Sequence, residues 1–281
     1  MGRKTSHMAY DSAPATDPAL RLKPREYGGV NWLGMRTLYQ REVKRFQKVW
    51  MQTVAAPVVT TLLYMLIFVV AVGATREVHG VPFSVFVAPG LIMMAILNNA
   101  FANTSSSLIQ AKIMGIASDF LTPPLSPAEL TAAFAFGAAT RGVFVGFVTL
   151  LAVTPFAGVH IAHPWAIASF GIGAALLMGL LGILAGLWSE KFDHLAAVQN
   201  FIIMPMTFLS GTFYTVDRLP EPFSTLSHFN PFFYLIDGFR YGFIGGADGN
   251  IGIGIAMTTG LVLVLAVVCW SLFRSGWRLK S

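Results

Sequence analysis

Residues 55–73 read AAPVVTTLLYMLIFVVAVG, a stretch of nineteen positions without a charged side chain. A helix needs about 20 apolar residues to cross the hydrocarbon core of a bilayer. This stretch therefore predicts a membrane-spanning helix.

Five further apolar stretches of similar length are found along the chain. They are residues 85–102, a span that ends near Phe156 and includes Arg141, and residues 165–188, 195–216 and 251–273. We expect the stretch 85–102 to fade into the polar run 103–107. The sequence thus predicts an all-α membrane protein whose residues 51–281 form a domain of six transmembrane helices.

The composition excludes a water-soluble globule. Of the 281 residues, 55% are hydrophobic and 11% are charged, and the mean hydropathy is +0.64. Soluble domains carry about 25% charged residues. The charged residues are also unevenly placed, because 14 of the 32 lie within the first 50 positions.

The net charge of +6 has two readings, a nucleic-acid partner or a topology signal. On one side of the predicted spans lie fifteen Lys or Arg residues, ten of them in residues 1–50, and on the other side lie three. Lys and Arg accumulate in cytoplasmic loops. We therefore expect both termini in the cytoplasm and no nucleic-acid partner.

The N-terminal region contains a helical stripe of apolar residues. They recur at steps of three or four, as Trp32, Met35, Tyr39, Val43, Phe46 and Trp50. Charged residues fill the remaining positions, so residues 31–50 are predicted to form an amphipathic helix at the membrane interface. It is either an anchor that fixes topology or a lever between a cytoplasmic partner and the first span. Residues 1–30 are expected to be a disordered cytoplasmic arm, whose residues 1–8 resemble a cloning remnant.

The cytoplasmic loop that follows the second span ends in a helix start signal. Ser126 is a good N-cap, Pro127 suits the first helical position and Glu129 completes a capping box, so a new helix is predicted to begin at Pro127. The preceding residues 119–125 expose apolar side chains where a simple connector would be polar. They either dock onto another protein or pack against the membrane surface.

Four polar residues near the second and third spans are candidates for a substrate path. They are Asn98, Asn99, Asn103 and Arg141. Amides in hydrocarbon must form hydrogen bonds or line water, and helix–helix bonding is the alternative reading. Arg141 lies deep if its helix is continuous, where it could contact an anionic head group. It marks the point of membrane insertion if residues 127–140 lie along the interface.

The segment 217–250 is too long and too aromatic for a plain loop, and no part of it is long enough to span. We read it as short helices that lie in the outer interface or dip back into the membrane, with an ordinary aromatic belt as the alternative. Asp237 and Arg240 are three residues apart and are expected to form a helical ion pair.

The chain carries none of the sequence motifs for nucleotide hydrolysis or common catalysis. No G-x-x-x-x-G-K-[ST], H-E-x-x-H or G-x-S-x-G pattern occurs, and Cys269 is the single cysteine. His160 and His163 have no third ligand nearby, so no metal or cofactor is expected. Two functions are considered at this point, a lipid-modifying membrane enzyme and a membrane scaffold that transports nothing. The enzyme would need clustered His, Asp or Glu residues, and the scaffold leaves the intramembrane asparagines unexplained.

Several long stretches in a fixed order resemble the ABC-2 type transport permeases, the membrane subunits of bacterial ABC exporters. The resemblance runs from about Arg41 to the C-terminus. It is carried by 87–94 (VAPGLIMM), 98–112 (NNAFANTSSSLIQAK), 120–129 (FLTPPLSPAE), 140–146 (TRGVFVG), 208–214 (FLSGTFY) and 226–245 (LSHFNPFFYLIDGFRYGFIG).

The resemblance implies a half-transporter of the bacterial inner membrane. Two copies would pair around a central path, each docked to a separate ATPase subunit that binds ATP and Mg, and would export a lipid-linked, glycan or amphiphilic substrate by alternating access. The ATPase-coupling turn would comprise Asp119, Phe120, Leu121, Thr122, Pro123, Pro124, Leu125 and Ser126, with Glu129 beside it. A re-entrant pair near the exit would include Phe232, Phe233, Tyr234, Asp237, Arg240 and Tyr241. Membrane lipids are further expected partners.

Overall fold

The computed structural model describes residues 29–73, 77–78, 80–115, 125–216 and 220–277. The described residues from Asn31 onward pack as one helical unit. Residues 1–28, and with them most of the predicted disordered arm, lie outside the described residues. The elements are α1 (Trp32–Lys48), the π-helical turn η2 (Met51–Ala55), α2 (Ala56–Val72), β1 (Glu77–Val78), β2 (Val81–Pro82), α3 (Phe83–Ile113), α5 (Pro127–Ala157), α6 (Pro164–Trp188), α7 (Phe192–Val198), the π-helical turn η3 (Gln199–Ile203), α8 (Met204–Leu209), α9 (Phe223–Phe229), α10 (Pro231–Ile244) and α11 (Ile251–Ser275).

Five helices of the described chain are long and apolar enough to cross a membrane. They are η2 with α2 (Met51–Val72), α3, α5, α6 and α11. The prediction of an all-α membrane protein is thereby confirmed, and five of the six predicted stretches coincide with these helices. The remaining stretch, 195–216, falls on the shorter consecutive elements α7, η3 and α8, which end at Leu209. Gly211, with a φ of 73°, lies in the turn that follows.

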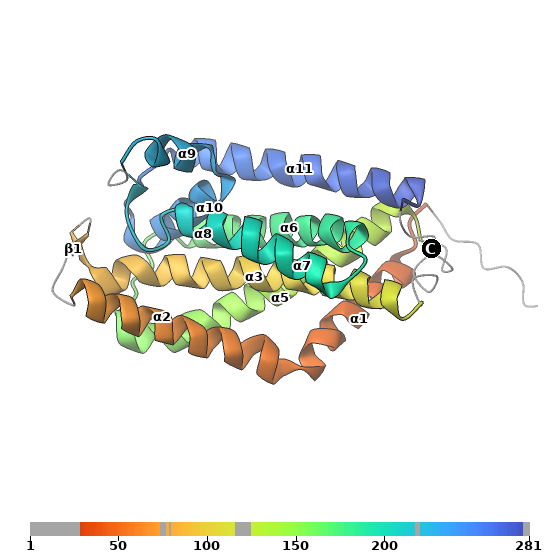
Figure 1. Ribbon diagram of the computed structural model, residues 1–281, viewed down its shortest axis with the longest axis horizontal. Helices are drawn as coiled ribbons and strands as arrows, with labels where there is room; N and C mark the ends of the chain where they lie inside the picture. Colours follow the sequence, from red (N-terminus) through yellow and green to blue (C-terminus); the bar gives the residue numbers. More distant parts are fainter. Residues whose placement is uncertain (1–28, 74–76, 79, 116–124, 217–219, 278–281) are drawn as a thin grey trace, which may run out of the picture. The chain divides into compact units, whose positions relative to one another are not determined.

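Helix α3 forms the centre of the unit, between α5 and α6 (Figure 1). Most residues in the apolar part of α3 are buried. Helices α2 and α11 lie on opposite faces of the unit and are largely exposed. Close approach of α3 and α6 depends on two glycines of α6. A methyl group on Gly186 would lie 2.9 Å from Leu108 Cβ, and one on Gly182 would lie 2.6 Å from the Phe101 carbonyl oxygen. Small residues at a helix interface allow such backbone contact.

The polar run 103–107 does not end α3, which continues to Ile113. The hydroxyls of Ser105 and Ser106 donate to the carbonyls of Phe101 and Ala102, four residues earlier. Because the serine hydroxyls form hydrogen bonds with carbonyl groups of the same helix, these residues can remain helical without water.

Helix α5 is continuous from Pro127 to Ala157, and its start confirms the predicted capping box. Ser126 Oγ accepts the Glu129 N–H, and the Glu129 carboxylate accepts the Ser126 N–H at 2.7 Å. Arg141 lies near the middle of this 31-residue helix. No break in the helix separates residues 127–140 from Arg141.

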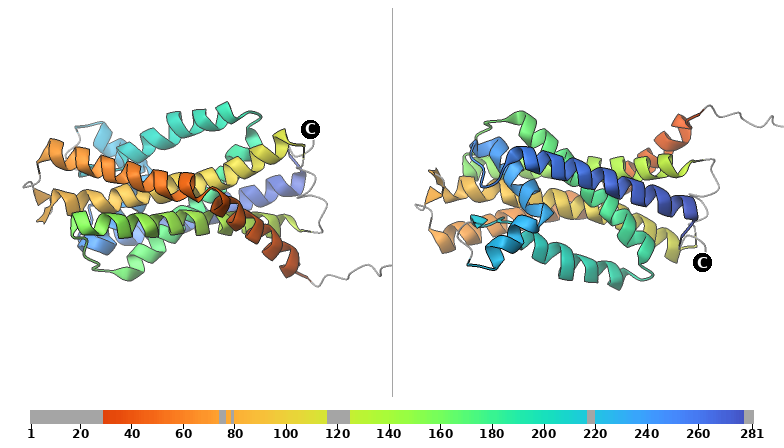
Figure 2. Two further views of the ribbon diagram at one scale, coloured as in Figure 1. Left: turned by 90° about the horizontal axis from the view of Figure 1, so that it is seen from below. Right: turned by 90° about the horizontal axis from the view of Figure 1, so that it is seen from above.

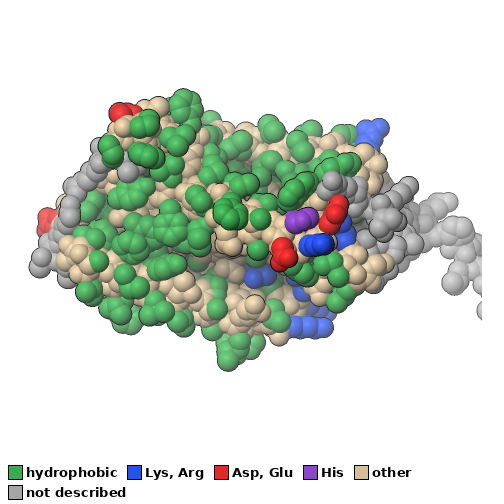
Figure 3. All heavy atoms as spheres, viewed as in Figure 1, with side chains coloured by type: hydrophobic (Ala, Val, Ile, Leu, Met, Phe, Trp, Pro, Cys, Tyr) green, Lys and Arg blue, Asp and Glu red, His purple; other side chains and the backbone are tan. Residues whose placement is uncertain are grey.

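The segment between α8 and α11 contains two short helices, α9 and α10, as predicted. They lie at the end of the unit where β1 pairs with β2, whereas α1 and the start of α5 lie at the opposite end (Figures 1 and 2). The charged side chains on the face shown in Figure 3 gather mainly toward the α1 end, and hydrophobic side chains cover most of the remainder.

Candidate functional site

Helix α1 is attached to the beginning of α5 by the Glu129 carboxylate. One carboxylate oxygen accepts the Ser126 N–H, and the other accepts the Asn31 N–H at 2.7 Å. Further along, Tyr39 Oη and Thr140 Oγ1 are 2.9 Å apart, and Gly137 gives room for the side chain of Glu42. Helix α1 therefore packs along the first half of α5.

The buried face of α1 differs from the predicted stripe. Trp32 and Trp50 are 68% and 59% exposed, whereas Leu38, Glu42 and Phe46 are buried. These three residues follow one another at steps of four, so they share one helix face. The charge on Glu42 placed it on the polar face in the sequence interpretation, and that assignment was wrong because α3 supplies polar partners for it.

Glu42 is the centre of a polar network between α1 and α3. Its carboxylate accepts Ser107 Oγ–H at 2.7 Å, Arg45 Nη2–H at 3.1 Å and Asn103 Nδ2–H at 3.4 Å. Arg45 also donates to Ser106 Oγ at 3.0 Å and to Asn103 Oδ1 at 3.2 Å. Because Glu42 is completely buried, this ion pair and its hydrogen bonds offset the cost of desolvating the carboxylate.

Arg141 extends this polar region toward the middle of α3. Its Nη2 donates to Asn99 Oδ1 at 3.2 Å, and its buried Nε has no hydrogen-bond partner among the described residues. Glu42 and Arg45 are both within electrostatic range of Arg141. The two guanidinium groups and one carboxylate leave one positive charge uncompensated within this group of three.

A polar cavity of about 300 Å³ lies next to Asn99, between α2, α3 and the η3–α8 segment. Seven of its thirteen lining residues carry an uncharged hydroxyl or amide: Gln52, Thr60, Thr61, Tyr64, Asn98, Asn99 and Gln199. Gln199 Nε2 lies 3.5 Å from Asn98 Oδ1, across the cavity wall.

The four predicted substrate-path residues are thus divided between two places. Asn98 and Asn99 line the cavity, and Arg141 is one hydrogen bond from it. Asn103 is buried in the network of Glu42 and Arg45 instead. The sequence interpretation missed Gln199, Tyr64 and Glu42; the step of four from Leu38 through Glu42 to Phe46 was the signal for the last of these.

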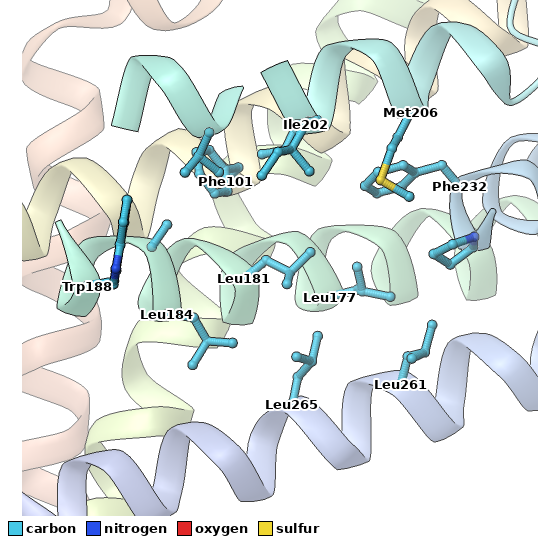
Figure 4. A pocket seen from close by; sticks show the side chains of 14 residues that line it. Phe101, Leu177, Leu181, Leu184, Trp188, Ile202, Met206, Phe232, Leu261 and Leu265 are labelled. Atoms are coloured by element: carbon cyan, nitrogen blue, oxygen red, sulfur yellow. The ribbon is translucent and has the colours of Figure 1, made fainter. Parts of the chain in front are cut away.

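A second cavity is apolar and lies between α6, α11 and the η3–α8 segment. It measures about 470 Å³, and Figure 4 shows Leu177, Leu181 and Leu184 of α6 facing Leu261 and Leu265 of α11 across it. Phe232 of α10 also lines this cavity. The contrast in lining chemistry distinguishes the polar cavity as the place where a hydrophilic group could bind.

The predicted exit residues on α10 mostly serve packing and loop anchoring in the described unit. Phe232 and Phe233 are buried, Tyr234 packs edge-on against Phe233, and Tyr241 stacks on His163 with ring centroids 4.5 Å apart.

Asp237 and Arg240 do not form the expected ion pair in the described structure. The Asp237 carboxylate accepts the N–H groups of Asp248 and Gly249, each at 2.9 Å. Arg240 donates to the Gly211 carbonyl at 2.6 Å and lies 4.0 Å from the ring centroid of Phe86. Burial raises the pKa of the Asp237 carboxyl, and the two N–H donors and Arg240 oppose that rise. The two side chains therefore anchor different loops.

The predicted coupling turn is described only in part. Residues 119–124, from Asp119 to Pro124, lie outside the described residues. Leu125 packs against the α1 residue Gly34, while Ser126 and Glu129 form the cap. Leu125 therefore belongs to the α1–α5 contact.

The described residues contain no group of three or more His, Cys, Asp or Glu side chains that could hold a metal ion.

Comparison with known proteins places the sequence in a family. The sequence profile described as ABC-2 type transporter matches residues 34–244. The chain belongs to the ABC-2 type transporter family. Its polar network, cavity and capped α5 start all lie within the matched range, and the YadH relatives are named transport permeases.

Two relatives illustrate the similarity over most of the chain. The inner membrane transport permease YadH of Escherichia coli K12 is 35% identical over 252 residues, which is 89% of this chain and 98% of the relative. Nodulation protein J of Rhizobium leguminosarum bv. viciae is 25% identical over 258 residues, 88% of this chain and 95% of the relative. The level of identity to YadH agrees with the resemblance to ABC-2 type transport permeases that the quoted motifs carry.

Proposed function

We propose that the chain is the permease subunit of an ATP-driven exporter. It moves a lipid-linked, glycan or amphiphilic substrate out of the cytoplasm or the inner leaflet by alternating access. The match to the ABC-2 type transporter family over residues 34–244 is the observation that carries this proposal.

The proposed assembly contains two copies of the chain and two ATP-binding cassette ATPase subunits, which bind the ATP and Mg. It lies in the bacterial inner membrane, as the name of the relative YadH supports. Elements α7, η3 and α8 form a sixth span, α9 and α10 form the re-entrant segment, and both termini are cytoplasmic.

The route from the ATPase to the membrane helices starts at the coupling turn. The turn continues into the cap at Ser126, and Glu129 bonds both to this cap and to the N-terminus of α1. A displacement of the turn would therefore move α1 and α5 together. Helix α1 would in turn act on α3 through the Glu42 network.

Co-purification with a co-expressed ATP-binding cassette ATPase tests the proposal. We expect Leu121→Asp to abolish co-purification and transport without loss of membrane insertion, because a charge in an apolar docking turn is costly to bury. Leu226→Asp is the matched control, since Leu226 is exposed on α9 at the opposite end of the unit. If Leu121→Asp still co-purifies with the ATPase, the turn is not part of the interface between the two proteins. If the unmodified chain binds no such ATPase, the proposed function is wrong.

A further inference from the structure

We infer that the polar cavity between α2, α3 and η3 binds the anionic, hydroxyl-bearing head group of an amphiphile. The inference rests on the proposed transport function and deepens it, because it names the chemistry of the group that enters the membrane domain. Three observations carry it: free hydrogen-bonding groups, an uncompensated cation and an apolar surround.

The cavity offers hydrogen-bonding groups that have no partner within the described part of the chain. Gln52, Thr60, Thr61 and Tyr64 make no side-chain hydrogen bond to any part of the chain that the structure describes, and all four line the cavity. Asn98 contributes an amide whose oxygen has only a 3.5 Å contact with Gln199. Uncharged hydroxyls and amides at one side of an otherwise apolar helix bundle are suited to the hydroxyl groups of a head group, which both donate and accept.

The charge of the ligand follows from Arg141. Its guanidinium is bonded to the cavity-lining Asn99, and its Nε lacks a partner among the described residues. Glu42 attracts the guanidinium, but its single negative charge is shared with Arg45, which it contacts at 3.1 Å, so the three groups keep one positive charge. A positive charge in a membrane domain is stabilised by a nearby anion, so a phosphate group next to Asn99 would complete the site.

The surround of the cavity favours a lipid over a soluble anion. The wall is completed by six apolar residues: Ala56, Pro57, Leu91, Met94, Ala95 and Met204. The neighbouring α2 exposes Val59, Leu63 and Leu66 on its outer face. A head group in the cavity would therefore place its acyl chains along an apolar helix surface. Burial of each CH₂ group there stabilises the bound state.

The test measures binding to the purified full chain in an amine-oxide detergent, which carries no sugar. Dioctanoyl-phosphatidylglycerol supplies phosphate, hydroxyls and acyl chains. Dioctanoyl-phosphatidylcholine has no net charge, octyl glucoside has hydroxyls without phosphate, and glycerol 3-phosphate has no acyl chain. We expect phosphatidylglycerol to bind at least about tenfold more tightly than each of the other three.

Variants locate the site. Arg141→Gln should weaken phosphatidylglycerol binding about tenfold and leave octyl glucoside unaffected, while Arg141→Lys retains the preference because it keeps the charge. Tyr64→Phe removes one free hydroxyl and should weaken binding about threefold to tenfold. The matched control is Arg274→Gln, at the end of α11, where the guanidinium lies over Trp270.

The outcomes separate this inference from the proposed function. Equal binding of phosphatidylglycerol and octyl glucoside, or an Arg141→Gln variant that elutes as the unmodified chain does and keeps full affinity, would overturn the head-group site. Equally tight binding of glycerol 3-phosphate would overturn the assignment to an amphiphile. Co-purification with the ATPase is measured on the same preparations, so a chain that binds the ATPase but shows no anion preference contradicts this inference alone.

Discussion

The Glu129 carboxylate accepts backbone N–H groups from two different elements, Ser126 before α5 and Asn31 before α1. Both bonds are 2.7 Å long, as expected for charge-assisted hydrogen bonds. One of them is a local capping contact. The other joins residues 98 positions apart in the chain, so a single side chain determines both a helix start and a tertiary contact.

We expect Glu129→Gln to weaken this attachment. The glutamine carbonyl can accept one N–H, but its amide nitrogen cannot accept the other, so one buried donor is left unpaired at a cost of about 1–3 kcal/mol. The melting temperature of the purified chain should fall by about 2–10 °C. Glu77→Gln, at the exposed position of β1, is the control. An unchanged melting temperature for Glu129→Gln would mean that the bond to Asn31 contributes nothing measurable.

At the scale of elements, two kinds of contact hold α3 in place. Polar contacts join it to α1 through Glu42, Asn103 and Ser107. Backbone contact joins it to α6, where Thr104 Oγ1 donates to the Gly179 carbonyl at 2.7 Å and Gly182 and Gly186 leave no space for a side chain. The α3–α6 contact is therefore the less tolerant of substitution.

Gly182→Ala tests the α3–α6 contact. Its methyl group would meet the Phe101 carbonyl oxygen at 2.6 Å as well as Thr104 Oγ1, so the helices must separate, at a cost of about 1–3 kcal/mol. Gly260→Ala is the matched control, because a methyl group there has nothing within 4 Å and alanine is the better helix former. Thermal unfolding of both variants in detergent measures the difference. Equal melting temperatures would show that the two helices are not in contact at Gly182.

At the scale of the whole molecule, the number of membrane crossings depends on the segment formed by α7, η3 and α8. If it crosses, the α6–α7 loop and the α10–α11 loop lie on opposite sides of the membrane. If it does not cross, they lie on the same side. The count of fifteen Lys or Arg residues against three assumes this crossing, which places the α6–α7 loop in the cytoplasm.

Single cysteines in the two loops report this topology. The native Cys269 is buried, so it adds little background labelling. We expect a membrane-impermeant thiol reagent to label Gly246→Cys in intact cells from which the outer membrane has been removed, whereas Glu190→Cys is labelled only after lysis. A methyl group at Gly246 has nothing within 4 Å, and Glu190 is exposed. Labelling of both sites from outside would contradict the six-span arrangement.

The sequence by itself determined the elements whose cause is local. A long apolar stretch such as 55–73 must form a helix in hydrocarbon, because only a helix satisfies its backbone hydrogen bonds within the segment. The start of α5 is also determined locally, by Ser126, Pro127 and Glu129, because a capping box involves residues only three positions apart.

The tertiary structure decided the features that depend on distant partners. Glu42 is buried because Ser107, 65 residues away, donates to it, and Arg141 adjoins the cavity through Asn99, 42 residues away. Hydropathy assigns a charged residue to the polar face of a helix, and it cannot detect a partner that only packing brings near. The division of the asparagines between network and cavity likewise follows from how α1, α2 and α5 pack around α3.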